Sequence, residues 1–373
     1  MKDILTQNNT DLNREILVIR KRINESITPT VLDAYRNWLL DTLDLFERRI
    51  RYNFELISMN HDLLVSEILS ETQNITINLR ALTERYLAPI LRYNSNDLFC
   101  LKAIDWLHKK HVQSKEIPFA VSDGSFAIFP TTETPVIYFL PSSSLNNLTH
   151  FPLIFHEFGH YLYAYHQDEM DMLVKELQTK IWNKCKPSYV GNNPRIASDI
   201  ESLNQIVETW YEWMQEFFCD AVGLQIGGAS YLKTFSIYLR MMGRGQFRAH
   251  ESELIQSSHP VTWLRIKFLI KRAHEFGLEP EASKIEKVWD QIAKKLHVKE
   301  EYYGFYHPSF GEDVYQTLDD MIVEANPVLY QDFLETEESL NIINLTNLAW
   351  AKYEHDPGAY DNWESSIVEK FLT

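Results

Sequence analysis

This 373-residue sequence lacks long apolar runs, paired cysteines and an export signal. No stretch of about 18 apolar residues occurs, and Met1 to Asn13 is polar without a basic segment before an apolar one. We therefore expect no membrane insertion and no secretion. The three cysteines are isolated, which excludes a disulfide framework and sites of the C-x-x-C type. A reducing, cytoplasmic compartment fits this usage.

Glycine, proline and positive charge are also scarce. Twelve glycines and fourteen prolines are few for this length, so we predict a mainly α-helical protein with a small β-sheet, an α+β fold. Neither a glycine-rich phosphate loop nor a G-x-S-x-G nucleophile elbow is present. The formal charge of −16 argues against binding to nucleic acid and to anionic membrane surfaces. This negative charge is compatible with the binding of neutral or basic peptides.

The most informative segment that is present is His156-Glu157-Phe158-Gly159-His160. On an α-helix, residues four apart share one face, so both imidazoles can reach one Zn²⁺ with Glu157 beside them. The flanking stretches, Phe151 to Phe155 and Tyr161 to Tyr163, are apolar and predict a buried helix. The alternative is a helix whose two histidines bond only to backbone groups or carboxylates.

Two residues compete for the place of a third metal ligand. His166 has the offset of the longer H-E-x-x-H-x-x-G-x-x-H pattern, but Tyr163 stands where that pattern has glycine. The helix is therefore expected to continue, and His166 would point away from the other two histidines.

Glu216 is the stronger candidate for the third ligand. It lies in a proline-free stretch, from about Ile196 to Gln225, with apolar residues at helical spacing. A buried carboxylate needs a partner, and zinc would supply one. Asp220, one turn further on, would accept a hydrogen bond from the outer nitrogen of a ligand histidine. The alternative places both acids on a solvated stripe.

A third motif gives these residues a family resemblance. Ser258-His259-Pro260-Val261-Thr262-Trp263-Leu264-Arg265-Ile266 follows the H-E-x-x-H and Glu216-x-x-x-Asp220 segments. Together they resemble a gluzincin metallopeptidase, of the family that includes the CAAX prenyl proteases, the heat-shock membrane proteases and their soluble relatives. The resemblance covers about a third of the chain. Val261 and Cys219 depart from it, because family members often have serine and alanine there.

The resemblance implies a zincin-like core with one Zn²⁺ per chain. In that core the metal ligands are His156, His160 and Glu216, and a fourth position stays open, as in catalytic zinc sites. His259 is a catalytic residue that contacts the substrate or stabilises the oxyanion. Arg265 is assigned to substrate binding. The alternative for these two residues is a surface histidine before a helix and an ordinary salt-bridged arginine.

The chemistry expected of such a site is hydrolysis of a peptide bond in a peptide or protein substrate. Zinc activates a water molecule, Glu157 takes its proton as general base, and the proton passes to the leaving amine. We therefore expect a soluble zinc metallopeptidase. One alternative is a narrow regulatory protease, or a zinc-binding sensor, that acts on one partner. A second is a non-enzymatic helical scaffold in which the motif is fortuitous.

Three regions are predicted along the chain. Residues 1–115 form long antiparallel helices, which are separated at Pro29 and at the segment from Met59 to Asp62. Residues 116–275 form the metallopeptidase core, and residues 276–373 form a helical region packed on that core. Two strands, at residues 126–129 and 136–140, flank a proline-bounded segment and suit a hairpin or a neighbouring pair. The helical repeats near the N-terminus are short, so oligomerisation through a coiled coil is left open.

Overall fold

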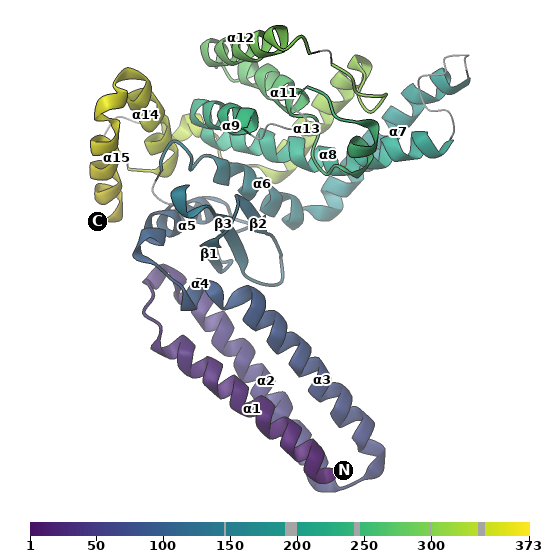
Figure 1. Ribbon diagram of the computed structural model, residues 1–373, viewed down its shortest axis with the longest axis vertical. Helices are drawn as coiled ribbons and strands as arrows, with labels where there is room; N and C mark the ends of the chain where they lie inside the picture. Colours follow the sequence, from purple (N-terminus) through teal and green to yellow (C-terminus); the bar gives the residue numbers. More distant parts are fainter. Residues whose placement is uncertain (145–146, 191–199, 242–246, 299, 335–339) are drawn as a thin grey trace. The chain divides into compact units, whose positions relative to one another are not determined.

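The structure of the protein is a computed structural model that describes residues 1–144, 147–190, 200–241, 247–298, 300–334 and 340–373. The fold consists mainly of helices, together with a small sheet of three strands (Figure 1). The prediction of a mainly α-helical protein with a small β-sheet is confirmed.

The chain forms two compact units. The first consists of Met1–His108, Glu116–Phe129 and Glu133–Leu145. The second consists of Lys109–Lys115, Pro130–Thr132 and Asn146–Thr373. The strands, which the sequence analysis grouped with residues 116–275, thus belong to the same unit as the N-terminal helices.

Three long helices, packed on one another, dominate the first unit (Figure 1). They are α1 (Lys2–Glu25), α2 (Asp33–Met59) and α3 (Val65–Ala81). Pro29 lies between α1 and α2, and Asn60 ends α2 in the left-handed conformation, with φ of 50°. Both breaks lie where the sequence predicted them. The apolar residues at helical spacing are buried, including Leu12, Ile16, Ile19, Ile23, Leu39, Ile50, Ile75 and Leu79.

A polar contact interrupts this apolar packing. Asn53 donates from Nδ2 to Oδ1 of Asn9 at 2.9 Å, and both side chains are fully buried. Thr72 of α3 completes the group, because its Oγ1 accepts from Nδ2 of Asn9 at 3.2 Å. One residue from each helix takes part, so the contact forms only when all three helices are in register.

The remaining elements of the first unit are short. A π-helical turn (Leu82–Tyr86) follows α3, and helices α4 (Ala88–Leu91) and α5 (Leu98–Lys110) come next. The strands are β1 (Phe119–Asp123), β2 (Ala127–Phe129) and β3 (Val136–Leu140). β2 and β3 pair antiparallel, as the sequence suggested, whereas β1 pairs parallel with β3 on its other side.

Helices make up the second unit. They are α6 (Leu153–Tyr165), α7 (Gln167–Val190), α8 (Ile200–Gly227), α9 (Ala229–Met241), α10 (Glu251–Gln256), α11 (Thr262–Glu275), α12 (Glu279–Lys295), α13 (Gly311–Ala325), α14 (Ile342–His355) and α15 (Pro357–Leu372). Among the described residues, none of the helices has both the length and the apolar character needed to cross a membrane.

Helix α8 runs through the core of the second unit. It packs on α6, α7, α9, α11 and α13, and from Phe217 to Leu224 every one of its side chains is buried. The start predicted near Ile196 lies outside the described residues, which resume at Ile200. A helix buried on all sides holds its polar side chains only where they have partners. Glu216 and Asp220 are such side chains.

Candidate metal centre

Helix α6 carries both histidines of the H-E-x-x-H segment on one face. The ring centroids of His156 and His160 lie 5.1 Å apart, at an interplanar angle of 87°. His156 and Glu157 are 7% and 8% exposed, and apolar side chains surround them on the same helix. Imidazole and carboxylate groups that are withdrawn from water need polar or ionic partners.

Glu216 of α8 faces both histidines. Its Oε2 lies 3.5 Å from Nε2 of His156, and its Oε1 lies 3.6 Å from Nε2 of His160. Zinc bonds to nitrogen and oxygen of about 2.0–2.2 Å place neighbouring tetrahedral ligands roughly 3.3–3.6 Å apart. The two distances, each to a different oxygen of Glu216, match those of neighbouring ligands around one ion, and the ligand atoms of the two histidines lie within 4.8 Å of one another. The structure brings together the ligand set expected from the sequence.

The donor atoms also have the chemistry that a cation requires. No described residue donates a hydrogen bond of adequate alignment to the buried Oε2 of Glu216, although Nη2 of Arg265 lies 3.0 Å away. The lone pairs of this oxygen are thus available for a further positive group. A divalent ion between Glu216 and the two histidines fits this site.

Asp220 lies behind His156, on the side away from Glu216. Its Oδ1 is 2.9 Å from Nδ1 of His156, although the alignment falls short of a hydrogen bond. The hydroxyl of Tyr231 donates to the same oxygen at 3.2 Å. The outer nitrogen of a histidine ligand is commonly held by a carboxylate, which fixes the orientation of its ring. Asp220 is placed for that task, as the sequence suggested.

Arg265 lies in the interior rather than at the surface of the site. Its Nε and Nη2 donate to Oδ2 and Oδ1 of Asp220 at 2.8 and 2.7 Å, and its guanidinium lies 4.9 Å from the ring centroid of Phe235. Only 5% of the residue is exposed. The sequence resemblance assigned Arg265 to substrate binding, whereas its observed contacts are with Asp220 and Glu216. This geometry favours a role in holding the two carboxylates.

The electrostatics of the cluster follow from these contacts. Burial acts to raise the pKa of Glu216, but the charges of Arg265 and His156 outweigh it and hold the pKa below its usual value. Burial acts to lower the pKa of His156, but Asp220 and Glu216 raise it to about 10. Glu216 and Asp220 thus both pair with the guanidinium of Arg265, and their negative charges favour the protonated form of His156. A metal ion would take the place of that proton.

The pKa shifts of His160 and Glu157 are opposite in sign to those of His156 and Glu216, respectively. Burial and the charge of His156 lower the pKa of His160 to about 4. Burial raises the pKa of Glu157 above its ordinary value. His160 is thereby kept neutral, which is the form that binds metal.

His259 precedes α11, and its ring lies beside the carboxylate of Glu216. Its Nε2 lies 3.4 Å from Oε1 of Glu216, and its side chain is 60% exposed. Ser258 contacts the other ring nitrogen, with 2.9 Å between its Oγ and Nδ1 of His259. An exposed imidazole beside the ligand carboxylate can meet a bound molecule.

The close approach of α6 and α8 depends on Gly159. A Cβ atom at this position would lie 2.8 Å from the Cα of Cys219 and 3.2 Å from its Sγ. Those distances are shorter than van der Waals contact, and the backbone of α8 cannot rotate away as a side chain can. Gly159, one of the two x positions of the H-E-x-x-H segment, therefore determines how closely the two histidines approach Glu216.

Replacing Gly159 by alanine should push the two helices apart. We expect unfolding free energy to fall by about 1–3 kcal/mol, the usual cost of overpacking, and zinc affinity to fall with it. Urea unfolding and zinc titration would measure both. Gly358→Ala on α15 is the matched control, because its Cβ would have no neighbour closer than 3.6 Å. Equal stability and zinc affinity for Gly159→Ala and the unsubstituted protein would contradict the prediction.

Several residues at the centre were not singled out from the sequence. Cys219 was noted only as a departure from the family pattern, yet its ligand atom and those of His156 and His160 all lie within 4.8 Å of one another. Phe235 of α9 stacks on the His156 ring, with centroids 5.8 Å apart. It is four residues after Tyr231, so the aromatic spacing of α9 was a signal that could have found both.

His166, the alternative third ligand, lies elsewhere. Helix α6 ends at Tyr165 rather than continuing, and a new helix starts at Gln167. Nδ1 of His166 lies 3.4 Å from Oε1 of Glu324 on α13. The structure thus gives this histidine a carboxylate partner of its own.

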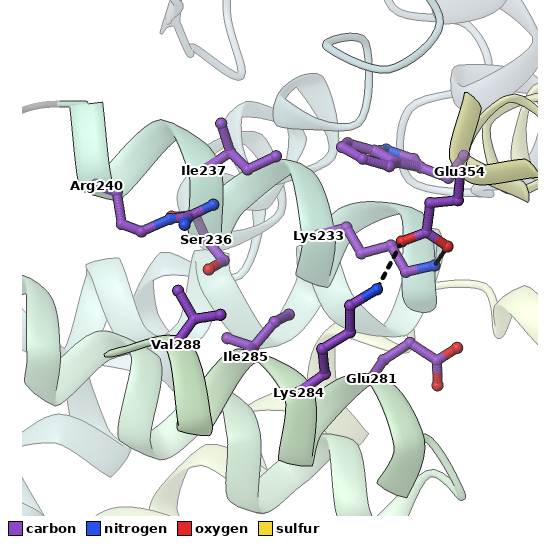
Figure 2. Close-up of a pocket in the computed structure, with 10 residues that line it drawn as sticks. Lys233, Ser236, Ile237, Arg240, Glu281, Lys284, Ile285, Val288 and Glu354 are labelled. Atoms are coloured by element: carbon purple, nitrogen blue, oxygen red, sulfur yellow. Dashed lines mark hydrogen bonds and ion pairs between the residues drawn. The ribbon is translucent and has the colours of Figure 1, made fainter. Parts of the chain in front are cut away.

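A separate cavity of about 130 Å³ lies between α9, α12 and α14 (Figure 2). Its walls include Ile237, Ile285 and Trp350, and Glu354 pairs there with Lys233 at 2.9 Å and with Lys284 at 3.4 Å. None of the histidines and carboxylates described above lines it. The candidate metal centre is therefore identified by the chemistry of its side chains and not by this cavity.

Comparisons of the chain with protein-family models, with curated proteins and with solved structures found no match.

Proposed function

We propose that this protein is a zinc-dependent peptidase with a zincin-like centre in its second unit. The observation that carries the proposal is the spacing of Nε2 of His156, Nε2 of His160 and the carboxylate of Glu216, at 3.5 and 3.6 Å. Glu157 lies on the same helix, next to the first of these ligands. This is the arrangement that H-E-x-x-H peptidases use.

His156, His160 and Glu216 would hold the metal, and Asp220 and Arg265 keep them oriented from behind. A zinc ion bound there supplies positive charge that polarises the scissile carbonyl and acidifies water. Three protein ligands leave a fourth position for the reactants, as catalytic sites require.

Glu157 moves the proton in the proposed reaction. Its carboxylate accepts a proton from the attacking water and then delivers it to the nitrogen of the leaving amine. Both transfers need a carboxyl group near the ligand histidines and shielded from bulk water. The burial of Glu157 meets that requirement.

His259 donates a hydrogen bond to the substrate oxygen as negative charge develops on it. When the hydroxyl of Ser258 donates to Nδ1, the ring hydrogen is at Nε2, which faces the site. A donor aimed at the developing oxyanion stabilises the transition state more than the ground state.

The test is to load the protein with zinc, measure the metal content, and incubate it with a diverse peptide mixture read by mass spectrometry. We expect one zinc per chain, cleavage products, loss of cleavage on chelation and its return with added zinc. His160→Ala should lose the zinc, whereas His166→Ala, the matched control outside the centre, should retain zinc and cleavage.

Two other outcomes separate the alternatives. One zinc per chain without cleavage would favour a regulatory protease or sensor with a single partner. No zinc, and no change on His156→Ala, would favour a helical scaffold and overturn the proposal.

A further inference from the structure

Cys219 occupies a position from which a thiol can reach the proposed metal. It lies on α8 between Glu216 and Asp220, is fully buried, and faces Gly159 across the contact with α6. Gly159 has no side chain, so nothing from that residue stands between the sulfur and α6.

The distances allow coordination. The ligand atoms of His156, His160 and Cys219 lie within 4.8 Å of one another. Zinc with ordinary bonds to nitrogen and sulfur places such atoms roughly 3.3–3.6 Å apart. An approach of roughly 1 Å, within the reach of side-chain rotation, would bring the three atoms to that separation.

We propose that Cys219 is a ligand of the metal in the resting protein, through its Sγ and together with His156, His160 and Glu216. The inference rests on the proposed metal centre and adds a fourth protein donor to it. During the proposed hydrolysis the thiolate leaves the metal and takes up a proton, so that the fourth position is free for the reactants. On binding, the S–H bond breaks, the proton passes to solvent, and a sulfur–metal bond forms. Thiolate is a soft ligand, so this centre prefers thiophilic ions such as Cd²⁺ more than a set of two histidines and a carboxylate does.

Cobalt substitution tests the proposal directly, because it reports metal binding and sulfur ligation in separate parts of the spectrum. Visible d–d bands of Co²⁺ report that the ion is bound, and a sulfur-to-cobalt charge-transfer band in the near ultraviolet reports a thiolate ligand. We expect both in the unsubstituted protein. Cys219→Ser, which keeps the shape of the side chain, should lose the charge-transfer band and keep the d–d bands.

The matched control is the double variant Cys100→Ala with Cys185→Ala, which removes the other two thiols and should keep both bands. A second readout is metal preference: Cys219→Ser should lose more affinity for Cd²⁺ than for Zn²⁺.

Each remaining outcome counts against Cys219 as a ligand. Bound cobalt without a charge-transfer band in the unsubstituted protein would overturn this inference and leave the proposed peptidase centre intact. A charge-transfer band that persists in Cys219→Ser would assign it to another thiol. Absence of bound cobalt would overturn both the inference and the metal centre on which it rests.

Discussion

Glu157→Gln should reduce peptide hydrolysis by about 10²–10⁴-fold, the contribution usual for a general acid–base group. Glutamine has nearly the same shape, but its amide cannot accept the proton of water or deliver it to the leaving amine. The metal ligands are untouched, so zinc content should stay at one per chain. Initial rates on the peptides cleaved by the unsubstituted protein, with zinc measured on the same samples, give both values.

Glu212→Gln is the matched control for this experiment. Glu212 is an exposed glutamate on α8, one turn before Glu216, so its loss should leave cleavage rates unchanged. Retained hydrolysis in Glu157→Gln would remove this residue from the mechanism. Loss of zinc in that variant would show that Glu157 acts on the metal centre instead of on the proton.

Arg265→Met should destabilise the second unit by about 3–5 kcal/mol, because it leaves buried carboxylates without their cation. Methionine fills much of the same space, so the loss is mainly one of charge. Asp220 and Glu216 would then repel one another, and added zinc should restore part of the stability by supplying positive charge. Urea unfolding with and without zinc, followed by tryptophan fluorescence, measures the two effects.

Arg272→Met provides the comparison. Arg272 is also buried on α11, but its partner Asp319 has a side chain that is 52% exposed and would stay solvated. We expect a loss of about 1 kcal/mol or less from that ion pair. Similar losses for the two variants, or no effect of zinc on Arg265→Met, would refute the role assigned to the buried Arg265.

The parts of the centre that could be anticipated are those that depend on local helical geometry. Residues four apart share a face of a helix, so the sequence alone places His156 beside His160 and Glu216 beside Asp220. It also indicates that these helices are buried, since apolar residues surround the motifs. The mainly α-helical fold and the breaks near Pro29 and Asn60 follow from equally local signals.

What could not be anticipated depends on contacts between elements. Arg265 has Asp220 as its partner only because α11 packs on α8, and a motif resemblance carries no information on that contact. The position of Cys219 near the proposed metal ligands depends on its contact with Gly159, which is distant in sequence and lies on another helix. The parallel pairing of β1 with β3 was missed for the same reason, because only the antiparallel pair is separated by a short turn.

The contact of Asn9, Asn53 and Thr72 has a consequence for the order of folding. All three residues belong to the first 72 of the chain, so the helices that they join can assemble from a continuous, early segment. Such local topology forms quickly compared with contacts that span a whole chain. During synthesis, α1–α3 can therefore be complete before α6 and α8 have left the ribosome. The helices of the proposed metal centre would then fold on a chain whose first part is already ordered.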